Sequence, residues 1–381
     1  MTVGAESAAA QFSARVAAVR ARITSSGADA LVVTHQPNIR YLSGHSGSAG
    51  ILVVSHDALA LLLDGRYREA ARRLLEEGLA PDGLEVVDVP ASYDSATLAY
   101  VGERHLRRVA VEGDYLPVGR FRWFERMAAG DGRTGPLWQP VAGLVEGVRT
   151  VKDVAEQESL RRSARGLTAV AEAAFRFVRE GVTERDVAGV IEAAMRASGF
   201  EKPAFDTIVA SGPNGALPHY RAGDRKLASG DLVVLDFGGV MDGYCSDITR
   251  TVALGPPGME ARRVYGAVLR AQQAAIGQVA PGRTAEEIDA AARAVLAADG
   301  LGEAFSHGTG HGIGLEVHEA PRVGRAVEGS APAELMAGMV FTVEPGAYLP
   351  GWGGVRIEDD VMVTGVGCEV LTDVPRELLV L

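Results

Sequence analysis

The apolar positions in the first 140 residues follow two different periods in turn. Apolar residues three to four positions apart predict a helix over 11–26, and the same spacing returns over 66–77. Short continuous apolar runs predict buried strands over residues 30–33, 51–54, 59–63, 84–89 and 108–111. Helices and strands that alternate in this way are typical of an α/β domain.

The segment 135–151 carries Pro136 and Pro140 and shows neither period. We therefore place a domain boundary inside it, which gives an N-terminal domain over 1–145 and a second domain over 146–381. A chain of 381 residues is long enough for two domains, each with an apolar core of its own.

The second part of the chain clusters its strands instead of alternating them strictly with helices. Helical spacing predicts helices over residues 153–180, 184–198, 259–279 and 284–299. β-prone runs predict strands over residues 205–210, 232–239, 244–253, 339–344 and 354–363. This order is typical of an α+β domain. Two acid-bearing pairs of strands within it suggest an internal duplication.

Composition and charge exclude several classes of function. Acidic residues outnumber basic ones 49 to 38, and the net charge of −11 argues against nucleic acid or a membrane surface as the main partner. No apolar stretch approaches the ~20 residues of a membrane-spanning helix, and residues 1–30 lack the apolar core of a secretion signal. Cys245 and Cys368 are too few for a disulfide framework, so we expect a reducing, cytoplasmic location.

A hairpin places two acids on one face of a strand pair. Asp242-Gly243 joins two β-prone runs and predicts a type I′ turn, whose central residues both have positive φ. This turn sets Asp236 opposite Thr249 and Asp247 opposite Gly238, so both acids and the threonine project from the same face. Diagonal neighbours of this kind have Cα atoms about 7–8 Å apart and can share a cation. Solvated acids on a polar face are the alternative, but apolar residues of the first strand share that face.

Three of the eight histidines, His307, His311 and His318, lie in one glycine-rich segment. The chain has 47 glycines in 381 residues, above the usual share of about 7%, and the glycines here let the backbone fold tightly and a ligand approach. A phosphate-binding loop is disfavoured because no Lys-Ser/Thr pair follows and the histidines stay unexplained. We expect one metal ligand and one acid–base or substrate-contacting group.

A second pair of acids follows further along the chain. Glu344 ends an apolar strand, and Glu358 lies in a β-prone run that also carries Arg356. The two side chains of that run share a face, so the guanidinium would keep Glu358 ionised and orient it. The alternative is an ordinary Arg–Glu pair on an exposed strand edge.

Four carboxylates and one imidazole thus form a candidate metal centre, made of Asp236, Asp247, His311, Glu344 and Glu358. This is too many acids for one small ion, and together they could hold two divalent cations. Oxygen-rich ligation favours Mn²⁺, while the imidazole also accepts Co²⁺, Zn²⁺ or Fe²⁺. A two-metal site of this kind activates a water molecule for hydrolysis. Cys245 shares the hairpin face and is expected to be a small filler.

The chain resembles the pita-bread metallopeptidases, a group that contains Xaa-Pro aminopeptidases, Xaa-Pro dipeptidases (prolidases), methionine aminopeptidases and creatinase. The motifs that carry the resemblance span about 155–378: Asp236-Phe-Gly-Gly239, Gly243-Tyr-Cys-Ser-Asp-Ile-Thr-Arg250, Gly310-His-Gly-Ile-Gly-Leu315, His318-Glu319, Thr342-Val-Glu-Pro-Gly346 and Val355-Arg-Ile-Glu-Asp359. The resemblance implies an α/β N-terminal domain followed by an α+β pita-bread domain. Asn38-Ile-Arg-Tyr-Leu-Ser-Gly44 and Leu63-Asp-Gly-Arg-Tyr67 resemble the creatinase/prolidase N-terminal domain, which disfavours methionine aminopeptidase.

The resemblance also implies a role for each metal-centre residue. Asp236 would chelate one metal, and Asp247 and Glu358 would bridge both. His311 and Glu344 would complete the other metal, with Glu344 also moving a proton from the bridging water.

Four further residues receive supporting roles from the resemblance. His219 and His318 would contact the scissile amide and the tetrahedral intermediate, while Thr249 and Arg356 would support the metal ligands. His307 matches no role and is expected to be structural.

The resemblance implies a metal-dependent aminopeptidase that removes the N-terminal residue from Xaa-Pro peptides. A prolidase restricted to Xaa-Pro dipeptides is the alternative within the same chemistry. A creatinase-like amidinohydrolase is less expected because that enzyme works without metal, and the complete ligand set also disfavours a metal-free binding protein. Relatives imply a homodimer or larger homo-oligomer, and the preferred first residue stays open.

Overall fold

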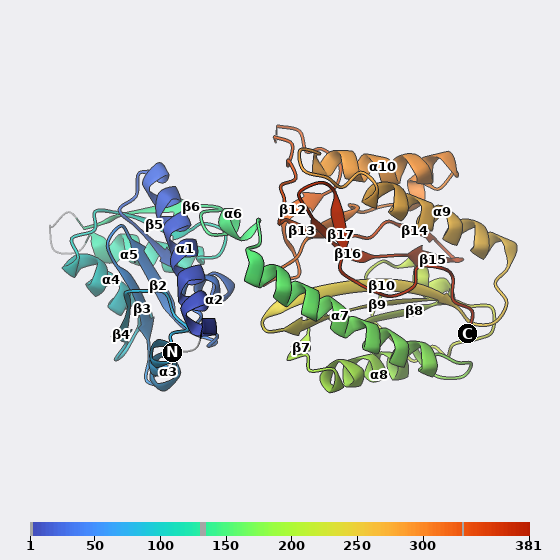
Figure 1. Cartoon of the computed structure of the whole chain (residues 1–381), viewed down its shortest axis with the longest axis horizontal. Coiled ribbons are helices and arrows are strands. Elements are labelled where there is room, and N and C mark those ends of the chain that lie inside the picture. Colours follow the sequence, from blue (N-terminus) through green and yellow to red (C-terminus); the bar gives the residue numbers. More distant parts are fainter. Residues whose placement is uncertain (1–2, 130–134, 330) are drawn as a thin grey trace. The chain divides into compact units, whose positions relative to one another are not determined.

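In the computed structural model the chain separates into two compact units, Met1–Arg149 and Thr150–Leu381. The structure describes residues 3–129, 135–329 and 331–381. Figure 1 shows each unit with its own sheets and helices. Among the described residues, none of the helices is both long and apolar enough to cross a membrane.

The first unit is built on a six-stranded sheet with the strand order β4-β3-β2-β1-β5-β6. Its strands are β1 (Ala30–Val33), β2 (Ile51–Ser55), β3 (Leu59–Leu63), β4 (Leu84–Asp88), β5 (Arg108–Glu112) and β6 (Leu137–Val141). β1 runs antiparallel to β2 and parallel to β5. All residues of the three central strands β1, β2 and β3 are buried, which explains why they have continuous apolar runs instead of alternation. The five strands predicted for this unit correspond to β1–β5, and their bounds are confirmed to within one residue at each end.

The helices of the first unit are α1 (Val3–Ser26), α2 (Gln36–Ser43), α3 (Arg68–Glu76), α4 (Tyr93–Glu103), α5 (Val118–Ala128) and α6 (Glu146–Arg149). The predicted helices over 11–26 and 66–77 are confirmed, with shifted ends. α2, α4 and α5 were not predicted from apolar spacing. α2 is short and is marked instead by its ends, with Pro37 in its first turn and Gly44 in the left-handed conformation after its last residue.

The strands of the second unit form three sheets. They are β7 (Lys202–Pro203), β8 (Ile208–Ser211), β9 (Leu232–Met241), β10 (Tyr244–Ala253), β11 (Gly310–Gly312), β12 (Glu319–Val323), β13 (Val340–Val343), β14 (Gly346–Leu349), β15 (Gly353–Arg356), β16 (Asp359–Val363) and β17 (Cys368–Val370). One sheet joins β7, β8 and β10 to β9, the second has the order β12-β11-β13-β16-β17, and the third pairs β14 with β15.

Two pairs of helices cover these sheets. They are α7 (Val154–Phe177) with α8 (Glu184–Ala197), and α9 (Met259–Ile276) with α10 (Ala285–Ala298); two short 3₁₀ turns lie at η2 (Gly212–Ala216) and η3 (Gly302–Ala304). The first pair packs its apolar side chains against β9 and β10, and the second pair packs against β13, β15 and β16. In Figure 1 the two pairs lie on opposite sides of the unit. This repeated arrangement agrees with the duplication that the sequence suggested, and the fold is the expected α/β domain plus α+β domain.

The acid-bearing hairpin has the predicted register. Asp236 lies opposite Thr249, and Asp247 lies opposite Gly238. The turn residues Asp242 and Gly243 have φ of 51° and 79°, as a type I′ turn requires.

The predicted strand over 354–363 is wrong as a single element. β15 ends at Arg356 and pairs with β14, whereas β16 begins at Asp359 and pairs with β13 and β17. Ile357 and Glu358 therefore lie where the chain passes from one sheet to another.

Candidate metal centre

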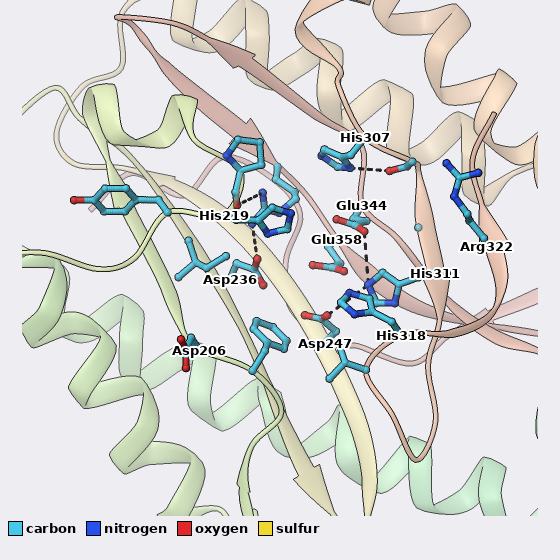
Figure 2. Close-up of a pocket in the computed structure, with 18 of the residues that line it drawn as sticks. Asp206, His219, Asp236, Asp247, His307, His311, His318, Arg322, Glu344 and Glu358 are labelled. Carbon is cyan, nitrogen blue, oxygen red and sulfur yellow. Dashed lines mark hydrogen bonds and ion pairs between the residues drawn. The ribbon is translucent and has the colours of Figure 1, made fainter. Parts of the chain in front are cut away.

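One cavity of about 620 Å³ in the second unit collects every side chain that the sequence proposed for metal binding or catalysis (Figure 2). Its walls include Asp236, Asp247, His311, Glu344 and Glu358, together with His219, His318 and Arg356. Small-molecule sites in proteins have volumes of about 300–1,000 Å³. The cavity is thus large enough for a small peptide, and the individual roles of these residues stay predictions.

Each candidate ligand is held at a strand or at a strand end. Asp236 and Asp247 project from β9 and β10, and His311 is the middle residue of β11. β11 packs so closely between its neighbours that a Cβ atom at Gly310 would lie 1.8 Å from the carbonyl oxygen of Thr342. The glycines around His311 therefore serve close approach of the backbone, as the sequence indicated.

The ligand atoms of three residues from distant parts of the chain converge. One donor atom each from Asp247, His311 and Glu358 lies within 4.8 Å of the others. The Nε2 atom of His311 also lies 3.7 Å from Oε1 of Glu344 and 4.0 Å from Oδ2 of Asp247. These spacings are short enough for shared cations and too long for direct hydrogen bonds.

Two buried carboxylate oxygens in this cluster lack hydrogen-bond donors. Within the described part of the chain, neither Oδ1 of Asp236 nor Oδ1 of Asp247 has a hydrogen-bond partner. A buried acceptor without a partner costs free energy, more so when it is charged. A bound cation would satisfy both oxygens, and a set of carboxylates with one imidazole is a donor set that divalent metals accept. The residues present therefore fit a divalent metal site.

Burial and mutual repulsion shift the protonation of the cluster. Burial raises the pKa values of Asp247 and Glu358, and neighbouring carboxylates raise them further. Burial also raises the pKa of Glu344 to about 8 and lowers the pKa of His311 to about 4. The imidazole is therefore neutral, as a metal ligand must be, while the metal-free carboxylates resist ionisation.

These shifts predict that the metal-free protein loses stability as the pH rises from 7 to 8. A carboxyl group whose pKa is higher in the folded than in the unfolded state binds more protons when folded, so folding is penalised as that proton is lost. The shift of Glu344 from 4.5 to about 8 alone corresponds to roughly 1 kcal/mol in the free energy of unfolding across this window. The histidine shifts do not oppose the trend, because imidazoles are largely neutral in both states above pH 7.

Urea unfolding of chelator-treated protein at several pH values measures this loss directly. We expect the Glu344→Gln variant to show a flatter profile, because the glutamine does not titrate. A metal-free protein whose stability is constant or rises from pH 7 to 8 would contradict the predicted protonation of the cluster.

A second layer of polar groups holds the ligands in place. Thr249 donates its hydroxyl hydrogen bond to Oε2 of Glu358 at 2.6 Å, and Nε of Arg356 donates to the same hydroxyl at 3.1 Å. Arg356 also forms an ion pair with Asp236 and donates to the hydroxyl of Tyr348 at 2.8 Å. Nε2 of His307 lies 2.8 Å from that hydroxyl. His307 itself lines the cavity, and its contact with Tyr348, a residue that the sequence did not single out, connects it to Arg356.

The two histidines proposed to contact substrate lie at different places on the cavity wall. His219 is exposed on the loop that follows η2, and its neighbour Pro218 accepts a hydrogen bond from Arg356 through its carbonyl oxygen at 3.3 Å. The ring of His318 packs edge-on against the ring of His311, with 4.3 Å between the centroids. Burial lowers the pKa of His318, so its neutral ring can donate one hydrogen bond.

Arg322 is a wall residue that the sequence analysis missed. It is the register partner of His311 across β11 and β12, so both side chains lie on the same face of the sheet. The pairing register of β11 shifts after His311, and no turn chemistry in the sequence announces it.

Cys245 does not line the cavity. It is buried in an apolar cluster with Ile313 and Val340, and burial raises the pKa of its thiol to about 12. A neutral thiol among apolar side chains agrees with the expected filler role.

Comparison with known proteins shows which family this chain resembles. Residues 158–365 match metallopeptidase family M24, and residues 15–151 match the creatinase/prolidase N-terminal domain. The Xaa-Pro dipeptidase of Pyrococcus furiosus is 43% identical over 354 residues, which cover 92% of this chain and 95% of that protein.

The solved structures that resemble this chain are named for two different activities. The Xaa-Pro dipeptidase from Bacillus anthracis has a TM-score of 0.90 at 36% identity, over 97% of this chain and 100% of that one. The X-Pro aminopeptidase from Thermotoga maritima has a TM-score of 0.82 at 35% identity, over 93% of this chain and 98% of that one.

Proposed function

The chain belongs to metallopeptidase family M24, and from that premise we propose that it is an Xaa-Pro dipeptidase, a prolidase that depends on two divalent cations, with Mn²⁺ preferred. The sequence alone favoured an Xaa-Pro aminopeptidase. The similarity to Xaa-Pro dipeptidases from Pyrococcus furiosus and Bacillus anthracis supports the dipeptidase alternative better.

The observation that carries the dipeptidase proposal is the exposed guanidinium of Arg322 on the cavity wall, across the strand pair from His311. Among the described residues, Arg322 pairs with no acid, and its one hydrogen bond runs to the carbonyl oxygen of Arg325 at 3.4 Å. A free guanidinium binds a carboxylate through two parallel hydrogen bonds. A dipeptide has its terminal carboxylate one residue beyond the scissile bond, whereas a longer peptide has a neutral amide there.

The cations would be held by Asp236, Asp247, His311, Glu344 and Glu358. When bound, they would polarise the scissile carbonyl group and make a water molecule acidic enough to attack it. Oδ2 of Asp236 forms an ion pair with Arg356, which leaves Oδ1, the oxygen without a hydrogen-bond partner among the described residues, for a cation.

The remaining steps belong to side chains of this chain. Glu344 takes the proton of the attacking water and returns it to the proline nitrogen, which must be protonated to leave as an amine. His318 donates a hydrogen bond to the oxygen that becomes negative in the tetrahedral intermediate, and His219 contacts the scissile amide from the opposite loop. Arg322 binds the carboxylate and so fixes the position of the proline residue.

An Xaa-Pro aminopeptidase is the second candidate, and one feature of the cavity favours it. A further cavity of about 370 Å³ shares His307, Gly308 and Arg322 with the first and extends to Arg325. This space adjoins the proposed carboxylate site at Arg322 and could accept residues that follow proline.

Substrate length separates the two candidates. We expect the Mn²⁺-loaded protein to hydrolyse Ala-Pro and to leave Ala-Pro-Ala and Met-Ala intact in an assay of released amino acids. Efficient cleavage of Ala-Pro-Ala would replace the dipeptidase by the aminopeptidase, and cleavage of Met-Ala alone would contradict both.

The Arg322→Gln variant tests how the carboxylate is recognised. A hydrogen bond to a charged group contributes about 1.5–3 kcal/mol, so we expect kcat/KM for Ala-Pro to fall about 10–100-fold, mostly through KM. The amide Ala-Pro-NH₂ should be a poor substrate of the native protein and should be affected little by the substitution. Arg325→Gln is the matched control, and an equal loss in both variants would contradict a specific role for Arg322.

A further inference from the structure

Glu358, a proposed metal ligand, lies in a part of the backbone that no β-ladder holds in place. It follows β15 and precedes β16, so it belongs to neither strand ladder. Its backbone nitrogen donates to the carbonyl oxygen of Thr249 at 3.1 Å, and its own carbonyl oxygen accepts a hydrogen bond from Nη1 of Arg250. The backbone on both sides of this side chain is thus held by consecutive residues of β10.

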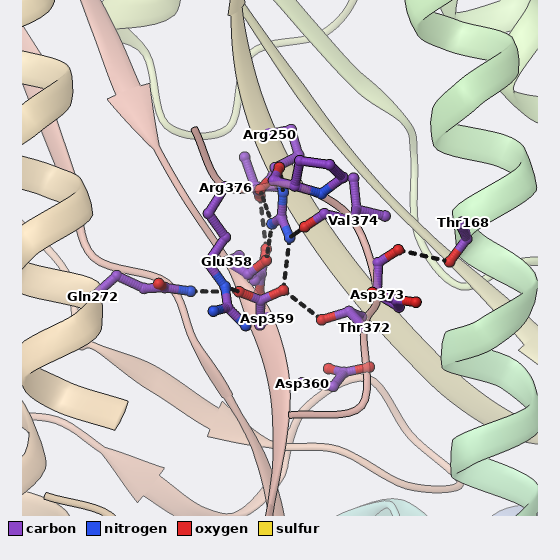
Figure 3. Close-up of polar contacts among 12 residues, drawn as sticks. Thr168, Arg250, Gln272, Glu358, Asp359, Asp360, Thr372, Asp373, Val374 and Arg376 are labelled. Carbon is purple, nitrogen blue, oxygen red and sulfur yellow. Dashed lines mark hydrogen bonds and ion pairs between the residues drawn. The ribbon is translucent and has the colours of Figure 1, made fainter. Parts of the chain in front are cut away.

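Arg250 is fully enclosed and uses all of its donors (Figure 3). A guanidinium has five N–H donors. Besides the carbonyl oxygen of Glu358, they reach the carbonyl oxygens of Thr249 at 2.9 Å, Pro375 at 2.9 Å and Val374 at 2.7 Å, and Oδ1 of Asp359 at 2.7 Å. Arg250 therefore ties β10, the chain around Glu358 and a segment near the C-terminus to one rigid group.

Asp359 supplies the negative charge that makes this enclosure possible. It is completely buried, and besides Arg250 it accepts hydrogen bonds from Gln272 and Arg376 on Oδ2 and from Thr372 on Oδ1. An unpaired guanidinium at this depth would carry a large desolvation cost, which the ion pair offsets.

We propose that Arg250, with Asp359 as its counter-ion, is a positioning residue that fixes the backbone of Glu358 and thereby tightens metal binding. The proposal rests on the proposed function in one respect, because it takes Glu358 to be a metal ligand. Groups that orient metal ligands typically change metal affinity by about 10–100-fold when they are lost. Arg250 does not line the cavity among its described wall residues, so its effect on the metals is indirect and runs through the backbone of Glu358.

Arg376 provides a matched comparison within the same network. Its Nε donates to Oδ2 of Asp359 at 2.5 Å, but the structure gives it no hydrogen bond to Glu358, and its side chain is 30% exposed. A network that serves only stability would leave the Mn²⁺ affinity of the folded protein unchanged when either arginine is replaced. A network that positions Glu358 would make metal binding depend on Arg250 far more than on Arg376.

The test is calorimetric titration of the metal-free full-length protein with Mn²⁺ alone, for the native chain, Arg250→Lys and Arg376→Gln. Lysine keeps the charge and cannot make five hydrogen bonds. We expect Mn²⁺ affinity to fall about 10–100-fold in Arg250→Lys and to stay within about twofold in Arg376→Gln. Native-like Mn²⁺ affinity in Arg250→Lys would overturn the positioning role, and so would an equal loss in both variants.

The same titration separates this inference from the proposed function. Failure of the native chain to bind Mn²⁺ would refute the proposed Mn²⁺-dependent function itself, before any variant is considered. If Arg250→Lys does not fold, Asp359→Asn replaces it, because the amide keeps the shape, removes the counter-charge of Arg250 and turns one acceptor oxygen into a donor. We then expect a loss of at least fivefold in Mn²⁺ affinity, and unchanged affinity would overturn the inference.

Discussion

Asp247→Asn is expected to abolish high-affinity Mn²⁺ binding and peptidase activity together. The carboxylate is buried, and one of its oxygens has no hydrogen-bond partner in the described chain. An amide of the same shape has one neutral oxygen in place of a charged one. Its NH₂ group cannot bind a cation. Loss of about 4 kcal/mol of transition-state stabilisation corresponds to about a thousandfold in kcat/KM, and we expect at least this loss.

The same substitution should stabilise the metal-free protein. Burial and the neighbouring carboxylates raise the pKa of Asp247, so its charge is unfavourable when no cation is present. An asparagine removes that charge, and the midpoint of thermal unfolding should rise in chelator at pH 8. A purely structural carboxylate would instead lose stability on this change.

Asp242→Asn is the matched control for this prediction. Asp242 lies at the turn of the same hairpin, is exposed, and has a φ of 51° that asparagine adopts readily. The control variant should keep native Mn²⁺ affinity and activity. Near-native turnover in Asp247→Asn would contradict the assignment of this residue as a ligand to both metals.

The hairpin could be predicted because its register follows from local chemistry. The Asp242-Gly243 turn allows one pairing of the two strands, and that pairing brings Asp236 and Asp247 to the same face. Alternation and a two-residue turn are encoded within about twenty neighbouring positions, so no knowledge of distant parts of the chain was needed.

The position of Glu358 could not be predicted in this way. Residues 354–363 have a continuous β-prone pattern, and the break at Ile357 and Glu358 arises because β15 and β16 find different partner strands. Pairing with distant strands overrides local propensity here. The hydrogen bonds from Arg250 that secure the break are equally distant in the sequence.

Arg322 and Tyr348 were missed for a related reason. Arg322 faces the cavity because β12 pairs with His311 through an irregular register, and Tyr348 is placed by its contacts with Arg356 and His307. Single charged or aromatic residues in loops and short strands have no periodic signal. Their function becomes visible only when the fold brings them beside the acids.

His318→Ala is expected to keep the metals and lose rate. The ring of His318 packs on the ring of His311 but lies outside the group of donor atoms that converge within 4.8 Å. Loss of one hydrogen-bond donor to a developing negative oxygen typically lowers kcat by about 10²–10³-fold. We therefore expect a loss of this size in kcat for Ala-Pro, with Mn²⁺ affinity within about threefold of the native value.

Two variants make the interpretation of this loss specific. His318→Gln keeps a hydrogen-bond donor and should recover part of the rate, because a neutral amide can still contact the oxygen. His56→Ala removes an exposed histidine of the other unit and should change neither quantity. If His318→Ala instead lost Mn²⁺ in proportion to its rate, the residue would be a ligand or a support of His311, and the oxyanion contact would have to be assigned to His219. Comparing kcat with Mn²⁺ affinity therefore distinguishes a group that contacts the substrate from one that holds the metal.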